Sequence, residues 1–170
     1  TPAAEQLGVE AGLRVAEALA RCPDLELVVA DPGATAHAMD QLTEHIETIG
    51  AAVEVVEPGI WRLRTEGLER LHGGIEGIVR RLKGVLPVGM DPRIGIAATP
   101  FAALQAAHHA ESRIPLQIDS HELQGFLSDL PIGRLPLDSQ ALTELGQMGI
   151  VTLGQFAAFA RTAVADRFGL

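Results

Sequence analysis

The spacing of apolar residues divides the chain into a stretch of alternating strands and helices and a stretch of helices alone. Between residues 25 and 118, short apolar runs alternate with segments in which apolar residues recur at helical spacing. The short runs predict strands, and the helical spacing predicts amphipathic helices. From residue 119 onward only helical spacing is found. We therefore expect an α/β fold, with a mixed sheet covered by helices and then a small all-helical unit.

The expected boundaries follow from apolar runs, prolines and caps. Strands are predicted at residues 25–30, 53–57, 60–65, 93–97 and 114–118. Helices are predicted at residues 12–22, 35–49, 72–86, 100–109, 120–130, 138–146, after a tight turn at 149–154, and at 163–168. The first strand should be buried, because it is apolar and β-branched. Pro58-Gly59 predicts a hairpin turn, Asp138 an N-cap, and Asp31-Pro32-Gly33 a turn or the start of the next helix.

Composition sets broad limits on the kind of protein. Of the 170 residues 47% are hydrophobic, which argues against disorder. The single cysteine, Cys22, excludes an internal disulfide framework and fits a reducing cytosol. No apolar run reaches the length of a membrane span, so a cytoplasmic protein without a membrane partner is expected. The opening Thr1-Pro2-Ala3 looks like the cut edge of a longer protein.

Basic residues are concentrated in the middle of an acidic chain. The net charge of −9 is the wrong sign for a stand-alone nucleic-acid binder. Residues 60–93 nevertheless hold seven basic and four acidic side chains. The candidates for phosphate contact in this cluster are Arg62, Arg64, Arg80, Arg81 and Lys83. Either they form a positive surface for DNA, or they are only the solvated face of a helix and the edges of strands.

Four motifs in order resemble the Y-family, or translesion, DNA polymerases. They are Leu7-Gly8-Val9 through Cys22-Pro23-Asp24, the stretch from Val53 to Gly67, Gly67-Leu68-Glu69-Arg70-Leu71-His72-Gly73-Gly74, and Arg93-Ile94-Gly95-Ile96-Ala97. The resemblance is closest to the ImuB-like branch of that family. It implies a fingers remnant at residues 1–24, a palm-like domain at 25–118 and a thumb at 119–170.

The same resemblance shows where polymerase chemistry is missing. Gly59 and Ile60 stand at the positions of the family's Asp-Glu pair, and neither side chain offers the oxygen ligands that a hard dication needs. Pro100 stands where the family has a lysine that contacts the triphosphate. A further family Asp-x-Asp strand would fall before Thr1. We therefore expect no catalytic residue, no metal site and no cofactor in this chain, with magnesium only if it belongs to an active polymerase.

The last third of the chain resembles the helix-hairpin-helix of the family's thumb. Gly146, Gly149, Thr152 and Gly154 follow its pattern, in which glycines let the backbone approach phosphate and helix N–H groups bind it. No Lys or Arg lies between Arg134 and Arg161, so any DNA binding there should be weak. The alternative is a packing unit that touches no DNA.

The functional expectation is a catalytically inactive polymerase homologue that acts as an adaptor in DNA repair and damage-induced (SOS) mutagenesis, with weak, sequence-independent DNA binding. The resemblance implies three protein partners: a replicative-type error-prone polymerase, a RecA-like accessory protein and the sliding clamp. Two alternatives stay open. One is an active DNA-directed DNA polymerase that uses acids upstream of this chain. The other is a protein-interaction module without DNA contact.

Overall fold

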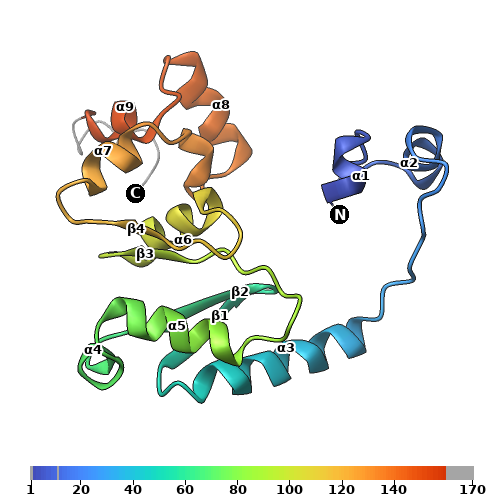
Figure 1. The fold of residues 1–170 in the computed structure, drawn as a ribbon. Helices are drawn as coiled ribbons and strands as arrows, with labels where there is room; N and C mark the ends of the chain where they lie inside the picture. Colours follow the sequence, from blue (N-terminus) through green and yellow to red (C-terminus); the bar gives the residue numbers. More distant parts are fainter. Residues whose placement is uncertain (1, 11, 160–170) are drawn as a thin grey trace. The chain divides into compact units, whose positions relative to one another are not determined.

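The computed structural model describes residues 2–10 and 12–159 (Figure 1). Its helices and short sheets confirm the α/β class. Contacts divide the chain into two units that meet between Leu42 and Thr43, within helix α3 (Pro32–Glu47). None of the helices in the described residues has the length and apolarity that a membrane crossing needs.

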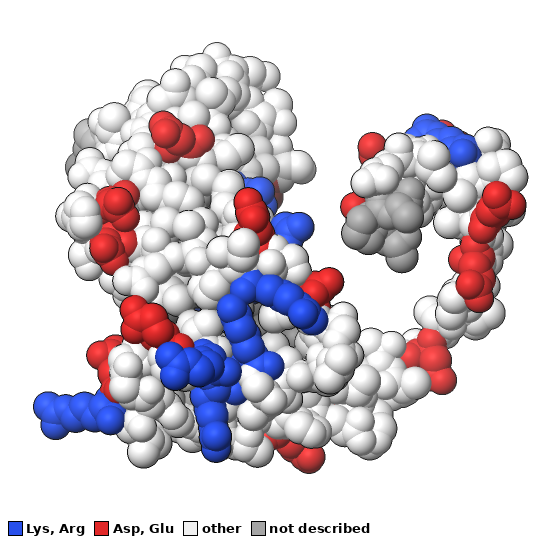
Figure 2. Space-filling model, viewed as in Figure 1, with Lys and Arg blue, Asp and Glu red and all other residues white. Residues whose placement is uncertain are grey.

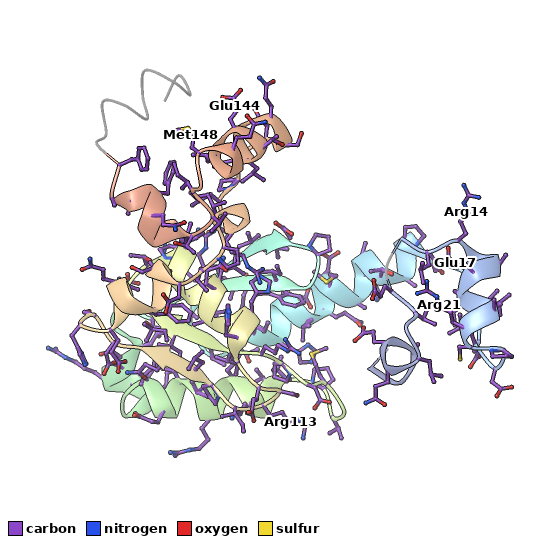
Figure 3. The ribbon with its side chains drawn as sticks, turned by 90° about the horizontal axis from the view of Figure 1, so that it is seen from above. Arg14, Glu17, Arg21, Arg113, Glu144 and Met148 are labelled. Carbon is purple, nitrogen blue, oxygen red and sulfur yellow. The ribbon has the colours of Figure 1, made fainter. Side chains whose placement is uncertain are left out.

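The first unit contains α1 (Pro2–Gln6), α2 (Val15–Arg21) and the start of α3. The guanidinium of Arg21 pairs with Glu17 one turn earlier on α2, at 3.1 Å, and also donates to the Gly8 carbonyl (Figure 3). Helix α3 begins three residues earlier than predicted. The Asp31 carboxylate accepts a hydrogen bond from the Ala34 N–H at 2.9 Å, so Asp31 caps the helix.

The prediction of a buried strand at residues 25–30 is wrong. No strand is assigned there, and Leu27, Val28 and Val29 are 56%, 82% and 92% exposed. The residues have high β-propensity, but a strand also needs a neighbour whose N–H and C=O groups complete the ladder. Within the described residues no strand pairs with this segment, so it is extended without sheet hydrogen bonds.

The predicted hairpin is confirmed in the second unit. Strands β1 (Ala52–Glu57) and β2 (Ile60–Arg64) pair antiparallel, with Glu57 opposite Ile60. Pro58 and Gly59 form the connection. Gly59 has φ of 88°, which suits the third residue of a type II turn that has proline before it.

Two helices follow the hairpin, where the sequence predicted one. They are α4 (Leu68–His72) and α5 (Ile75–Val85), and the break falls at Gly73 and Gly74, which both have positive φ. Gly77 lets the two helices meet closely, since a Cβ there would lie 1.7 Å from the His72 carbonyl oxygen. A core of Ile49, Ala51 and Ile78, with Val53, Leu63, Leu68, Ile75, Leu82 and Val85 packed on it, joins α5 to the hairpin.

A second, parallel pair of strands follows. Strands β3 (Gly95–Ala97) and β4 (Leu116–Ile118) are joined through α6 (Pro100–His109), and both are shorter than predicted. Gly95 allows α6 to lie against β3, because a Cβ there would be 2.1 Å from the Ala103 carbonyl oxygen. The described chain thus has one antiparallel and one parallel pair of strands. The two pairs form two separate two-stranded sheets.

The last described part is helical, as predicted. It contains α7 (Leu123–Ser128), a 3-10 turn (Ile132–Arg134), α8 (Ser139–Gln147) and α9 (Leu153–Ala157). Asp138 caps α8 by accepting from the Ala141 N–H at 2.7 Å, which confirms that prediction. Leu130, Ile132, Leu145, Ile150 and Leu153 form its core. The predicted helix at 163–168 lies outside the described residues.

Candidate nucleic-acid interface

The positions predicted to match the family's metal ligands lie in and beside the β1–β2 turn. Gly59 is in the turn and Ile60 opens β2, so neither position supplies an oxygen ligand. Farther along the hairpin, the Glu54 carboxylate pairs with Arg62 at 3.2 Å. The matched positions therefore do not fit magnesium. Among residues 2–10 and 12–159, no group of three or more His, Cys, Asp or Glu side chains could hold a metal ion.

The other departure lies at the start of α6. Pro100 occupies the first turn of the helix, where its missing N–H and fixed φ suit it. Thr99 caps the helix by accepting from the Ala102 N–H at 3.3 Å. The position where the resemblance implies a triphosphate-contacting lysine therefore starts a helix in this structure.

The five basic candidates lie on two different faces. Val53 and Leu63 pair across the hairpin and pack against α5. Because strand side chains alternate, Arg62 and Arg64 lie on the opposite face of the hairpin. Arg62 is neutralised there by Glu54, its cross-strand partner. Arg64 is exposed, and no ion pair is found for it in the described residues.

Arg80, Arg81 and Lys83 lie on the outer face of α5. All three are exposed, and neither arginine has an acidic partner among the described residues. Figure 2 shows Lys and Arg side chains gathered over α5. The two arginines line an open hollow, whose other lining residues are Leu71, His72, Gly77, Gly84 and Val85. Within the described residues, this outer face is more positive than the hairpin face, because no carboxylate pairs with its two arginines.

Arg113 fixes one edge of the α5 surface, and sequence reasoning missed it. The Lys83 ammonium donates to the Arg113 carbonyl oxygen at 2.6 Å. The Arg113 guanidinium pairs with Asp91 at 2.7 Å and donates to the Met90 carbonyl at 3.1 Å (Figure 3). Arg113 has φ of 63°, a conformation rare for residues other than glycine. No sequence pattern predicts this backbone conformation at an arginine, because it depends on the tertiary contacts of the residue.

Helix α8 ends in a motif that uses Gly149 for its backbone conformation. Gly149 has φ of 78°. Its N–H bonds the Gly146 carbonyl at 3.0 Å, and the Ile150 N–H bonds the Leu145 carbonyl at 2.9 Å. These two bonds define a Schellman motif, in which Ile150 and Leu145 also meet in the core. Gly149 is thus needed to end the helix, whether or not DNA approaches it.

The start of α9 is closed by a capping box. The Gln155 side-chain oxygen accepts from the N–H groups of Val151 and Thr152 at 2.8 and 3.1 Å, while Thr152 accepts from the Gln155 N–H at 3.3 Å. The Leu153 N–H donates a hydrogen bond to the Leu130 carbonyl oxygen at 2.9 Å. The pattern Thr-x-x-Gln could have revealed this box from the sequence.

Gly154 also has a packing role. A Cβ at Gly154 would lie 2.9 Å from Ser128, so the glycine allows α9 to approach α7. Gly146 and Gly149, by contrast, are exposed, and a Cβ at either would meet nothing within 4 Å. Phosphate contact by Gly146, Gly149, Thr152 and Gly154 stays a prediction, but the hydrogen bonds leave few free N–H groups for it.

The short sheets, α6 and the capped helical end together define a polymerase-like domain without metal-binding acids at the matched positions. The family model described as "impB/mucB/samB family" matches residues 1–108. The chain belongs to this family, and the Y-family resemblance seen in its motifs is confirmed.

Among curated proteins, the chain is 30% identical over 166 residues to Protein ImuB of Caulobacter vibrioides (strain NA1000 / CB15N), covering 96% of this chain and 36% of ImuB. It is 29% identical over 110 residues to DNA polymerase IV of Dehalococcoides mccartyi (strain CBDB1), covering 63% of this chain and 28% of that protein. The chain thus spans about a third of the length of these relatives.

Solved structures show the same fold. The structure titled "Dbh Ternary Complex" superposes with a TM-score of 0.80 at 19% identity, covering 98% of this chain and 51% of that chain. DinB from Sulfolobus solfataricus superposes with a TM-score of 0.71 at 18% identity, covering 98% and 50%. At these identities the likeness concerns the fold.

Proposed function

We propose that this chain is the polymerase-like part of a catalytically inactive Y-family homologue that acts as an adaptor in translesion mutagenesis. The observation that carries this proposal is the β1–β2 turn. Its Gly59 and Ile60 replace two metal ligands, and Gly59 serves the turn itself. The similarity to ImuB over 96% of the chain supports the same branch.

The DNA contact in this proposal is weak and sequence-independent. Arg80, Arg81 and Lys83 on α5 carry most of the charge, since Arg62 is neutralised by Glu54. Phosphates are the only groups engaged, so affinity should fall steeply with salt and vary little with sequence. Arg64 adds a smaller contribution from the other face of the hairpin.

The adaptor role places the protein in the cytoplasm beside DNA synthesis. Its partners are then an error-prone replicative-type polymerase, a RecA-like accessory protein and the sliding clamp, as the resemblance to the ImuB-like branch implies. Co-purification of the intact protein with each of these three classes tests the assignment one partner at a time.

Primer extension tests the proposed inactivity. The intact protein is incubated with primer-template, the four deoxynucleoside triphosphates and magnesium, and a metal-free reaction serves as the control. We expect no incorporation. Magnesium-dependent, template-directed extension would overturn the proposal and favour the second candidate, an active polymerase with acids outside this chain. The similarity to DNA polymerase IV over 110 residues is the observation that favours that candidate.

A further inference from the structure

The hollow lined by the two arginines of α5 lies where α4 meets α5. Its walls are Leu71 and His72 at the end of α4 and five residues of α5, and its volume is about 450 Å³. Gly73 and Gly74 connect the two helices, and their positive φ values allow the chain to turn sharply there. Figure 1 shows α4 at the N-terminal end of α5. We call this concave surface the α5 hollow.

The lining of the α5 hollow is positive. Arg80 and Arg81 line it, and none of the other lining residues is acidic. Neighbouring residues of a helix point about 100° apart, so the two guanidinium groups border the hollow from different directions. Lys83 is not part of the lining, and its ammonium donates to the Arg113 carbonyl oxygen at 2.6 Å instead. The charge of the hollow therefore comes from the two arginines.

A carboxylate with the right spacing to neutralise Arg80 is turned away from it. Glu76 precedes Arg80 by four residues on α5, a spacing that favours an ion pair between acidic and basic side chains of a helix. Both residues lie in the described part of the chain, yet no ion pair joins them. The Glu76 carboxylate lies beside Gly74, where its Oε2 would be 3.2 Å from an added Cβ. The charge of Arg80 is thus left available for a ligand.

Gly84 keeps the space beside the arginines open. It follows Arg80 by four residues and Arg81 by three, so it lies on the same side of α5, and it also lines the hollow. Glycine weakens a helix relative to alanine. Packing among the described residues does not require this glycine, because a Cβ there would meet nothing within 4 Å. A larger side chain at this position would occupy the hollow.

A phosphate group with two negative charges matches these features. Guanidinium groups present planar forks of N–H donors that bind phosphate oxygens in pairs. Two guanidinium groups balance a phosphomonoester, whose charge is about −1.5 to −2 at neutral pH. A phosphodiester inside a DNA strand carries only a single negative charge. The volume of the hollow lies within the range of ligand pockets, roughly 300–1,000 Å³, so a sugar can follow the phosphate.

We propose that the α5 hollow binds a phosphomonoester, and that its source is the terminal phosphate of a DNA strand. This inference rests on the proposed DNA contact of α5 and makes it specific, because a strand end then binds more tightly than the interior of a strand. A free phosphate compound offers the same chemistry, and the experiment below separates the two sources.

Two oligonucleotides that differ only at one end test the proposal. Both are single-stranded, have the same sequence and carry a fluorophore at the 3′ end, and one has a 5′-phosphate where the other has a 5′-hydroxyl. Each is titrated with the 170-residue chain at low salt and followed by anisotropy. We expect the 5′-phosphorylated strand to bind about tenfold more tightly, because charge-assisted hydrogen bonds are added at its end.

Removing the two guanidinium groups tests the charge of the hollow. Arg80→Gln with Arg81→Gln should weaken binding of both strands and reduce the preference for the 5′-phosphate to less than about twofold. The matched control is Arg14→Gln with Arg134→Gln, which removes the same charge from two exposed arginines outside the hollow. The control should keep the tenfold preference.

Filling the hollow tests its shape without changing any charge. Gly84→Leu places a side chain in the hollow and should reduce the 5′-phosphate preference to less than about twofold. Its melting temperature should not fall, because leucine is a better helix former than glycine. The matched control is Gly125→Leu in α7, at another exposed helical glycine where a Cβ would meet nothing within 4 Å. This control should keep the preference.

Inorganic phosphate separates the two sources. It is titrated at constant ionic strength, and the amide NMR shifts of residues 77–84 are followed. We expect shifts in the wild type that are absent from the Arg80→Gln, Arg81→Gln variant. Such shifts without a 5′-phosphate preference would support the phosphate site and overturn the strand end as its source.

The remaining outcomes distinguish this inference from the proposed DNA contact. Equal affinity for the two strands, together with no phosphate-induced shifts, would overturn the inference. The DNA contact would still stand if both strands then bound more weakly to the Arg80→Gln, Arg81→Gln variant. Absence of binding to either strand at low salt would overturn the DNA contact and the strand end together.

Discussion

The α5 region and the α8–α9 hairpin are built alike but present opposite surfaces. Each packs a short helical segment on its own small core, centred on Ile78 in one case and Leu145 in the other. The outer face of α5 carries Arg80 and Arg81, which have no acidic partner among the described residues, whereas residues 145–159 hold no Asp, Glu, Lys or Arg. The basic charge therefore lies on α5 and not on the hairpin, whose glycines led the sequence analysis to expect phosphate contact.

This difference shows that a glycine pattern alone does not define a phosphate site. Gly149 ends α8 through its left-handed conformation, and Gly154 lets α9 approach Ser128. Both roles, ending a helix and letting two helices pack, need no ligand. Whether such a glycine pattern binds phosphate therefore depends on the side chains around it, and residues 145–159 supply no Lys or Arg.

Truncating one core residue in each region should have the largest effect, and each truncation should destabilise its own region. Leu145→Ala should lower the free energy of unfolding of the helical end by about 2–5 kcal/mol, because Leu145 is 1% exposed and its removal leaves a cavity. Ile78→Ala, at a residue 3% exposed, should do the same to the α5 region. Hydrogen exchange resolved by segment measures both.

The two regions count as independent only if each loss stays local. Protection in α8 should fall in Leu145→Ala with little change in α5, and the reverse should hold for Ile78→Ala. Equal loss of protection in both segments from either variant would show one cooperative core and end the comparison.

Reversing charge on α5 should have the next largest effect. Arg80→Glu with Arg81→Glu should lower affinity for primer-template about tenfold or more at low salt and make the salt dependence shallower by about two counterions. The matched control, Arg62→Glu with Arg64→Glu, should have a smaller effect, because Arg62 is already paired with Glu54. A larger loss in the control would move the DNA contact to the hairpin face.

Ile60→Asp tests whether the former metal position is now packing surface. Ile60 is half-buried and lies opposite Glu57, so a carboxylate there is desolvated and faces a like charge. We expect a loss of about 1–3 kcal/mol in unfolding free energy. Ile60→Asn, uncharged and of similar size to Asp, should lose less. A melting temperature of Ile60→Asp that rises with magnesium would contradict this reading.

Removing the capping side chain should have the smallest effect. Gln155→Ala deletes the acceptor for two N–H groups and should cost about 1 kcal/mol of stability. It also frees the N–H groups of Val151 and Thr152. We expect no gain in DNA affinity, measured against Gln147→Ala as a control. A gain specific to Gln155→Ala would restore the hairpin as a phosphate site.

Local signals predicted much of the fold. The Pro58-Gly59 turn, the Asp138 cap and the proline start of α6 are each encoded by adjacent residues, and all three are present. The segment 25–30 shows the limit of such signals, since β-propensity gave a strand where no partner lies in the described residues. The single helix predicted at 72–86 likewise begins only after two glycines with positive φ.

The sequence by itself determined the family and the order of most elements, and it predicted the loss of metal ligands at Gly59 and Ile60, because these depend on which residue types stand at successive positions. The tertiary structure decided which charges share a face. It separated Arg62 from Arg80, paired Arg62 with Glu54, and satisfied the hairpin N–H groups with Gln155. Such pairings depend on which residues the folded backbone brings close together. The distance between two side chains across a sheet or a turn is fixed only when the whole unit has packed.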